Sequence, residues 1–363
     1  MGAVSSNPAM IEARIVREFP AKRDSPAFQL EIEFEAGPGI TVLFGPSGSG
    51  KTLTLDCIAG FSTPNVGRIL IDDAIVFDSG ARVNLRPQER RCGYVFQNYA
   101  LFPHMSLRDN LQFAAVRSKR LERNGKIGAM LERFRLSDVA GRKPHEVSGG
   151  QKQRCSIARA LVSDPKVLLL DEPARGLDAP LRADLYALLH QVRADFEMPI
   201  LLVTHDLDEC FELGDRMLVI NKGELVQTGS PAEVCARPAS VDLARLLGAF
   251  NLFPVEILTL DPSRNSSTLR WGEFELRGEY YPAHFRGDRV QLLATPRQLR
   301  AMPRLERPGP NQVPVELVRI VEMPDTVRLE FDGGIRVEMP RGQIDRNNRD
   351  WLVEFPERGL RIL

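Results

Sequence analysis

Hydrophobic and polar positions alternate in some parts of this chain and cluster in others, and these patterns predict its secondary structure. Apolar and polar residues alternate through most of residues 11–35, which indicates two half-buried antiparallel strands. Residues 111–142 are charged and helical in pattern, so we expect a peripheral helical subdomain there. Buried strands are expected at three largely apolar runs, 40–44, 167–170 and 200–204. The run at 167–170 is wholly apolar, which is typical of a parallel sheet covered on both faces.

A different pattern takes over in the C-terminal third of the chain. Helical periodicity stops near Gly248, and Asp332-Gly333-Gly334 predicts a hairpin turn. Short runs with β-like composition lie on both sides of that turn, at 268–271, 290–293, 313–321, 327–331 and 335–339. This part of the chain is therefore predicted to be all-β.

The length and composition fit a division into two domains. A chain of 363 residues allows two or three domains. Its residues are 43% hydrophobic and 26% charged, and no run of eighteen apolar residues could span a bilayer. Residues 1–10 lack the basic start and apolar core of a signal peptide and predict a disordered tail. We expect domains at 11–238 and 239–363.

Charge and cysteine content narrow the classes of function. Lys plus Arg equals Asp plus Glu at 48 each, so no global positive field favours nucleic acid as a partner. The five cysteines are odd in number, widely spaced and without a metal-ligand pattern, which is typical of a reduced, cytosolic chain.

One stretch carries most of the functional information. Gly45-Pro46-Ser47-Gly48-Ser49-Gly50-Lys51-Thr52 matches the phosphate-loop pattern G-x-x-x-x-G-K-[ST]. Glycines let successive backbone N–H groups converge on an anion, and the following helix adds the positive end of its dipole. Lys51 is expected to reach the β- and γ-phosphates of ATP, and the Thr52 hydroxyl to bind the bridging Mg²⁺. The loop alone predicts a nucleotide but no particular reaction.

Four further polar residues follow predicted strands and are candidates for the chemistry. Asp171 and Glu172 end the run at 167–170, where Asp171 is suited to hold Mg²⁺ and Glu172 to polarise the hydrolytic water. Gln97 follows another apolar strand and could bind Mg²⁺ and orient water, although a lone glutamine is usually a surface residue. His205 follows the run at 200–204 and could hydrogen-bond the γ-phosphate, although a lone histidine is more often structural.

A second phosphate cradle is predicted at Ser148-Gly149-Gly150-Gln151. Ser148 is a good helix N-cap, and the paired glycines permit close approach of backbone to a ligand. One chain needs only one such cradle for each nucleotide, so the second cradle indicates that a second protein molecule takes part. Upstream, Phe19 could stack on an adenine ring, and a core aromatic residue is an equally good interpretation.

The ordered set of phosphate loop, Gln97, Val147 to Gln151, Asp171, Glu172, Asp178 and His205 resembles the ATP-binding subunit of ABC transporters. The resemblance covers about residues 11–235. It implies an α/β fold: a mixed-sheet core with an antiparallel β subdomain and a helical subdomain, followed by a small all-β OB-like domain. It also implies a head-to-tail homodimer that places each ATP between one phosphate loop and the partner's Ser148, Gly149 and Gly150.

The same resemblance implies roles for individual residues. Glu172 is the base, Gln97 senses Mg²⁺ and the membrane partner, His205 contacts the γ-phosphate, and Asp178 signals across the dimer. Arg175 departs from the family, which usually has a small residue at this place.

The C-terminal β module resembles the one found on many importer ATPases of this family. The stretches 76–79, 84–91 and 101–107 most resemble the ATPases of molybdate importers. Sulfate and ferric-iron importers share much of these stretches. The resemblance implies two permease subunits, a solute-binding protein and a place on the cytoplasmic face of the bacterial inner membrane. The competing interpretations are an ABC-type ATPase acting on nucleic acid or ribosomes and a solute-sensing regulator.

Overall fold

The computed structural model describes residues 11–21, 26–115, 120–304, 308–342 and 348–363. The tail predicted at 1–10 lies outside these residues. The described residues form two compact units, divided between Arg237 and Pro238 and called unit 1 and unit 2 below.

Unit 1 is built on an eleven-stranded mixed sheet with the order β6-β5-β4-β1-β2-β11-β10-β3-β9-β8-β7. The two strands predicted within 11–35 are confirmed as an antiparallel pair in which Ile11 faces Ala36. The strands are β1 (Ile11–Phe19), β2 (Phe28–Ala36), β3 (Gly39–Phe44), β4 (Val66–Ile71), β5 (Ala74–Asp78), β6 (Val83–Asn84), β7 (Cys92–Val95), β8 (Val167–Asp171), β9 (Pro199–Thr204), β10 (Arg216–Asn221) and β11 (Glu224–Gly229).

The strands β7, β8, β9, β3 and β10 pair in parallel, and they position the candidate site. β8 and β9 are buried along their whole length, as the apolar runs at 167–170 and 200–204 predict. Because the carboxyl ends of parallel strands meet at one edge of a sheet, the residues that follow β3, β7, β8 and β9 gather there.

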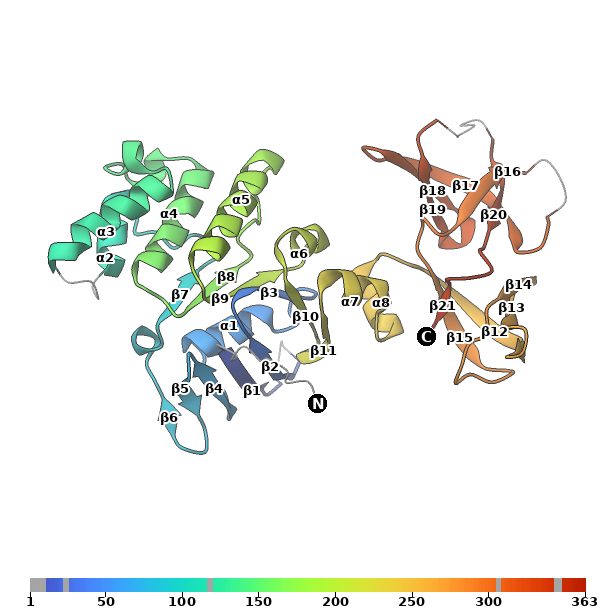
Figure 1. Ribbon diagram of the computed structural model, residues 1–363, viewed down its shortest axis with the longest axis horizontal. Helices are drawn as coiled ribbons and strands as arrows, with labels where there is room; N and C mark the ends of the chain where they lie inside the picture. The colour runs from blue at the N-terminus through green and yellow to red at the C-terminus, as the bar shows by residue number, and fades with distance from the viewer. Residues whose placement is uncertain (1–10, 22–25, 116–119, 305–307, 343–347) are drawn as a thin grey trace. The chain divides into compact units, whose positions relative to one another are not determined.

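Helices complete unit 1. In Figure 1, α2, α3 and α4 lie together at one end of the unit, which confirms the predicted helical subdomain. Among the described helices, none combines the length and the apolar character that crossing a bilayer requires. The α-helices are α1 (Lys51–Ala59), α2 (Leu107–Ala114), α3 (Arg120–Arg133), α4 (Gly149–Val162), α5 (Ala179–Asp195), α6 (Leu207–Leu213) and α7 (Pro231–Ala236), with short 3₁₀ helices at η1 (Pro87–Glu89), η3 (Ser137–Val139) and η4 (Pro144–Glu146).

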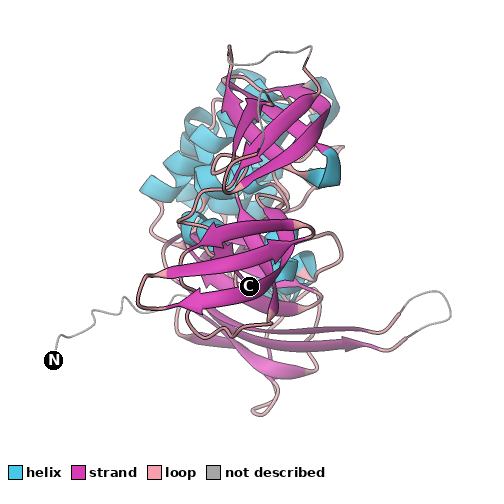
Figure 2. Ribbon diagram, turned by 90° about the vertical axis from the view of Figure 1, so that its right-hand side faces the viewer, coloured by secondary structure: helices cyan, strands magenta, loops and turns pink. Residues whose placement is uncertain are grey.

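Unit 2 begins with helix α8 (Val241–Leu247), which ends at Gly248 in the left-handed conformation. The rest is all-β, as predicted, and its strands form two five-stranded sheets, β14-β13-β12-β15-β21 and β16-β20-β17-β18-β19 (Figure 2). The predicted turn at 332–334 (η5, Asp332–Gly334) joins β18 to β19. The strands are β12 (Asn251–Asp261), β13 (Ser266–Trp271), β14 (Phe274–Gly278), β15 (Arg289–Ala294), β16 (Arg300–Pro303), β17 (Gln312–Glu322), β18 (Thr326–Phe331), β19 (Arg336–Pro340), β20 (Asp350–Glu354) and β21 (Arg361–Ile362).

Candidate functional site

The phosphate loop connects β3 to α1, in the strand–loop–helix context that the motif requires. A Cβ at Gly45 would lie 2.0 Å from the carbonyl oxygen of Ile220 in β10. Gly50 is the N-cap of α1 at φ 107°, and a Cβ there would lie 2.7 Å from the side chain of Leu30. Glycine is therefore required at both positions by the neighbouring strands as well as by the ligand.

Polar groups inside the loop fit a polyphosphate. Lys51 is 5% exposed, and its ammonium donates to the carbonyl oxygens of Gly45 and Pro46 at 2.8 Å each. Burial lowers the pKa of Lys51, and the nearby charges of Glu172 and Asp171 oppose this shift. The buried Ser49 hydroxyl has no hydrogen-bond partner among the described residues, so it is free to accept or donate to a bound anion.

Oxygen groups suited to Mg²⁺ lie directly beside the loop. The Thr52 hydroxyl donates to the Asp171 carboxylate at 3.0 Å, across from α1 to the end of β8. Burial raises the pKa of Asp171, the charges of Glu172 and Asp56 add to this shift, and the Thr52 hydrogen bond opposes it. A hydroxyl and a carboxylate in contact are hard oxygen ligands of the kind that Mg²⁺ prefers, and a bound cation would keep the carboxylate ionised.

Glu172 and His205 also come together at this edge of the sheet. β8 and β9 are parallel neighbours in which Asp171 pairs with Val203. The Glu172 backbone N–H donates to the Val203 carbonyl at 3.0 Å, and Nδ1 of His205 lies 3.3 Å from Oε1 of Glu172. Glu172 has φ 45°, a left-handed conformation that is uncommon for a non-glycine residue. Such backbone strain clusters at functional sites, where surrounding structure maintains it.

Gln97 lies two residues after β7, the strand that pairs with β8. Arg175 contacts both Gln97 and Glu172. With the Gln97 amide oxygen facing the guanidinium, Nη1 and Nε of Arg175 lie 2.6 Å and 3.1 Å from that oxygen. Nη1 of Arg175 is also 3.0 Å from Oε2 of Glu172. In the sequence, Arg175 stands out only as a departure from a pattern, and its contacts become visible only in the structure.

The second predicted cradle begins helix α4 and is separate from the first. The Ser148 hydroxyl accepts from the Gln151 N–H at 3.3 Å, and the Gln151 side chain accepts from the Ser148 N–H at 3.0 Å, which forms a capping box. A Cβ at Gly150 would lie 2.9 Å from Leu181, whereas one at Gly149 would meet no atom closer than 3.9 Å. Within the described residues, no hydrogen bond or ion pair joins 148–151 to 45–52.

The remaining predicted residues lie as follows. Asp178 is the N-cap of α5 and accepts from the Leu181 N–H at 3.0 Å. Phe19 ends β1 and is 38% exposed. Its ring lies 6.5 Å from that of Phe28, whose Cζ atom would be 3.3 Å from a Cβ at Gly50. The exposed ring therefore lies one side chain away from the start of α1.

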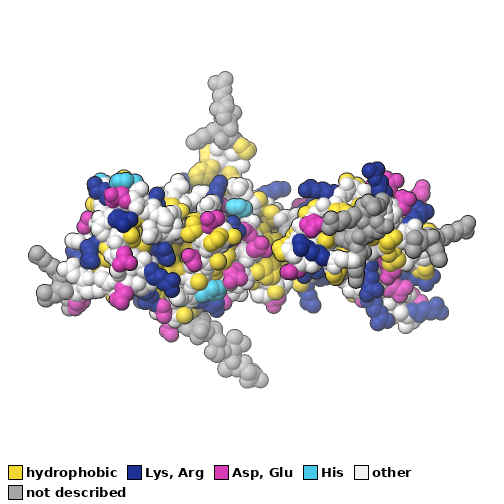
Figure 3. Space-filling model, turned by 90° about the horizontal axis from the view of Figure 1, so that it is seen from above, with side chains coloured by type: hydrophobic (Ala, Val, Ile, Leu, Met, Phe, Trp, Pro, Cys, Tyr) yellow, Lys and Arg dark blue, Asp and Glu magenta, His cyan; other side chains and the backbone are white. Residues whose placement is uncertain are grey.

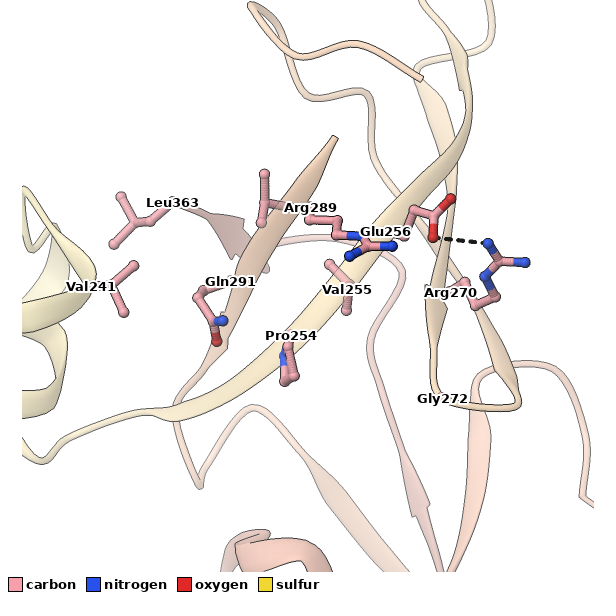
Figure 4. A pocket seen from close by; sticks show the side chains of 10 residues that line it. Val241, Pro254, Val255, Glu256, Arg270, Gly272, Arg289, Gln291 and Leu363 are labelled. Atoms are coloured by element: carbon pink, nitrogen blue, oxygen red, sulfur yellow. Dashed lines mark hydrogen bonds and ion pairs between the residues drawn. The ribbon is translucent and has the colours of Figure 1, made fainter. Parts of the chain in front are cut away.

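Unit 2 has a cavity of its own, of about 480 Å³ (Figure 4). Arg270 in its lining donates to Glu256 at 2.8 Å, and that bond holds the pKa of the Glu256 carboxyl below its ordinary value. In Figure 4 the side chain of Arg289, another lining residue, extends beside Glu256. This polar hollow is lined entirely by residues of unit 2 and contains none of the predicted nucleotide-binding residues.

Comparisons with known proteins agree with this arrangement. Residues 29–175 match a family model described as ABC transporter. The molybdenum import ATP-binding protein ModC of Rhodospirillum rubrum is 40% identical over 222 residues, which are 61% of this chain and 60% of that protein. The sulfate/thiosulfate import ATP-binding protein CysA of Thermosynechococcus vestitus is 40% identical over 62% of this chain and 65% of its own length. Both matches span less than two thirds of the relative.

A third relative matches over more of its length. The spermidine/putrescine import ATP-binding protein PotA of Marinobacter nauticus is 37% identical over 295 residues, which are 80% of this chain and 76% of that protein. Among solved structures, a dimeric ATP-binding cassette in a post-hydrolysis state bound to ADP and Pi aligns with a TM-score of 0.52. It is 25% identical and covers 61% of this chain and 99% of its own.

Proposed function

The chain belongs to the ABC transporter ATP-binding family, and from this membership we propose that it is the ATP-hydrolysing subunit of an importer. One observation carries the proposal. The phosphate loop, the Thr52–Asp171 oxygen pair and the Glu172–His205 pair all lie where β3, β8 and β9 end. This arrangement supports binding of a nucleoside triphosphate, with Glu172 next to the site of hydrolysis.

Each side chain has a distinct part in the proposed reaction. Lys51 neutralises charge on the outer phosphates, and Thr52 and Asp171, with Gln97, hold the metal. Mg²⁺, when bound, supplies positive charge that offsets the charge developing on the phosphate oxygens. Glu172 accepts a proton from the attacking water, and His205 donates a hydrogen bond toward the γ-phosphate.

We propose that two copies act together. Each chain carries a phosphate loop and a separate N-terminal cradle at Ser148, Gly149 and Gly150. A head-to-tail pair would place the cradle of one chain against the nucleotide on the other. The dimeric cassette that aligns with 61% of this chain supports this proposal. Asp178, next to the loop that contains Arg175, is proposed to transmit closure across the pair, and Phe19 to stack on the adenine.

Unit 1 carries a groove for which we propose a role in docking the membrane partners. The lining of a cavity of about 550 Å³ in unit 1 includes two arginines, Arg91 and Arg159, and four aromatic residues: Tyr94, Phe96, Phe102 and Phe113. Phe113 is 56% exposed, and nearby Phe61, which stacks on Phe96, is 53% exposed. An exposed aromatic groove is typical of a protein interface. We propose that permease subunits bind here, which would hold the chain at the cytoplasmic face of the inner membrane.

The transported solute is proposed to be an oxyanion, with molybdate first. The molybdenum and sulfate/thiosulfate relatives support this proposal. The spermidine/putrescine relative makes a polyamine the main alternative, with ferric iron another. Unit 2 is proposed to be an accessory or regulatory domain, and a solute-binding protein is proposed to deliver the cargo.

An ATPase acting on nucleic acid or ribosomes is less well supported. The chain has no net charge, and on the face in Figure 3 basic side chains lie among acidic ones. A binder of nucleic acid would be expected to gather Lys and Arg into a continuous field.

The test is uptake of labelled molybdate, sulfate and spermidine by cells whose only copy of the chain carries Glu172→Gln. We expect loss of one of these fluxes, with the Glu224→Gln variant as a matched control, because Glu224 is exposed at the start of β11. Purification of the wild-type chain should also retain a multi-span membrane protein. If all three fluxes persist and the chain instead purifies with ribosomes or DNA, the importer proposal is wrong.

A further inference from the structure

Arg175 is held over Glu172 by a tight turn. The Arg175 N–H donates to the Glu172 carbonyl at 3.2 Å, and the Leu177 N–H donates to the Ala174 carbonyl at 3.2 Å. Gly176, between them, has φ 75°, a conformation that glycine adopts without strain. The turn brings the guanidinium back to the end of β8, so its contact with Glu172 follows from the local backbone.

The guanidinium contacts two groups that follow the neighbouring strands β7 and β8. Oε2 of Glu172 is 3.0 Å away, and the Gln97 amide oxygen is 2.6 Å and 3.1 Å from two of its nitrogens. The Glu172 carboxylate is contacted on its other oxygen by His205 at 3.3 Å. One cation therefore contacts both the proposed base and a proposed metal ligand.

We propose that Arg175 is a positioning residue that acts as an internal cation, in competition with Mg²⁺ and nucleotide for Gln97 and Glu172. This inference, called the Arg175 latch below, rests on the proposed function. In the nucleotide-free chain the latch holds both side chains in a resting arrangement. Binding of the Mg²⁺–nucleotide complex then requires the guanidinium to withdraw, which raises the Mg²⁺ concentration that the chain needs.

The exposure of the groups involved sets the size of the effect. The Arg175 side chain is 58% exposed and the Glu172 side chain 15%. Solvent screens such a pair, so the latch is weak enough to open with each binding event. We expect removal of the guanidinium to change Mg²⁺ affinity by roughly three- to tenfold, the range of one or two partly screened charge-assisted hydrogen bonds.

The experiment is an equilibrium titration of the full chain with Mg²⁺ at a fixed concentration of a fluorescent, non-hydrolysable ATP analogue. The variants are Arg175→Ser and Arg175→Lys, with Arg245→Ser as the control. Arg245 makes an ion pair three residues apart with Asp242 and has a side-chain exposure of 61%. It thus matches Arg175 in spacing and exposure but lies in unit 2.

We expect Arg175→Ser to lower the half-saturating Mg²⁺ concentration roughly three- to tenfold. Arg175→Lys should lie between this variant and the wild type, because an ammonium keeps the charge but lacks the fork that contacts two oxygens. Arg245→Ser should match the wild type. A half-saturating concentration for Arg175→Ser within twofold of the wild type, or above it, overturns the latch alone. A wild-type chain that binds no analogue at any Mg²⁺ concentration overturns the proposed function and the latch with it.

Discussion

The most testable prediction about stability concerns the buried side chain of Arg90. It is a charged side chain with 1% exposure, and it lies at the end of the helix that follows the phosphate loop. Its nitrogens donate to the carbonyl oxygens of Cys57 and Ile58 at 2.7 Å and 3.0 Å, to that of Leu85 at 2.9 Å, and to the Asn84 side chain at 2.7 Å. The positive charge also interacts favourably with the negative, C-terminal end of the α1 helix dipole.

Replacement of Arg90 by Met keeps much of the apolar volume and removes every one of these donors. A buried acceptor left without a donor costs about 1–3 kcal/mol, and Arg90→Met strands several such oxygens. Part of this cost is offset because the variant no longer buries a charge. We expect the free energy of unfolding of unit 1 to fall by about 4 kcal/mol, which for a unit of this size lowers its melting temperature by roughly 8–16 °C.

The chain provides a way to follow each unit separately. Both tryptophans, Trp271 and Trp351, lie in unit 2, so tryptophan fluorescence reports the unfolding of unit 2. Helices α1 to α7 lie in unit 1, so far-ultraviolet circular dichroism reports mainly unit 1. Arg90→Met should lower the melting temperature seen by circular dichroism and leave the fluorescence transition in place.

The control is Arg91→Met, because Arg91 is exposed and its side chain donates to the Asp164 carbonyl at 3.0 Å, while its backbone carbonyl, which accepts from the Lys166 N–H, is unaffected by the change. This change should alter the free energy of unfolding by less than about 1 kcal/mol. The reasoning about Arg90 is refuted if Arg90→Met shifts the circular dichroism transition no more than Arg91→Met does. It is also refuted if the two optical transitions fall together.

Two further predictions concern single side chains. Lys51→Ala should weaken binding of a fluorescent ATP analogue by at least roughly tenfold, since a charge-assisted contact to phosphate is lost, and unchanged affinity would contradict the phosphate role. Glu209 is 3% exposed, and burial raises its pKa from 4.5 to about 7. The folded chain therefore binds a proton that the unfolded chain has already released between these pH values, and stability falls as the pH rises through this window. Glu209→Gln removes the cost of ionising this buried carboxyl. The melting temperature of the variant relative to wild type should therefore be higher at pH 8 than at pH 5, by the equivalent of up to about 3 kcal/mol. Equal differences at the two pH values would show that the Glu209 carboxyl is ionised at both.

Local sequence determined those parts of the protein whose residues are adjacent in the chain. The phosphate loop is one continuous stretch between a strand and a helix. The strand–loop–helix arrangement around its glycines, Lys51 and Thr52 could be predicted because the spacing of these residues is enough to define the motif. Ser148 could be predicted as an N-cap for the same reason, since its partner Gln151 is three residues away. Apolar runs identified the buried strands because burial on both faces leaves few polar positions in them, Thr41 and Thr204 being the exceptions.

The order of the strands was decided by the tertiary structure. β3 lies between β10 and β9 in the sheet, so Ile220 of β10 closes on Gly45, although the two are far apart in the chain. Hydrophobic periodicity reports which face of a strand is buried but says nothing about which strand is its neighbour.

The contacts of the two arginines also depend on the fold. Arg90 and Arg175 both follow a proline, Pro87 and Pro173, by two or three residues. One is enclosed by the end of α1 and donates to backbone carbonyls, while the other remains exposed and spans Gln97 and Glu172. A guanidinium takes whichever oxygen atoms the chain brings within reach. Its distant partners, Cys57 and Ile58 for Arg90 and Gln97 for Arg175, are thus set by long-range packing, which the sequence alone did not reveal. The identity of the chemical groups at the site was determined by the sequence itself.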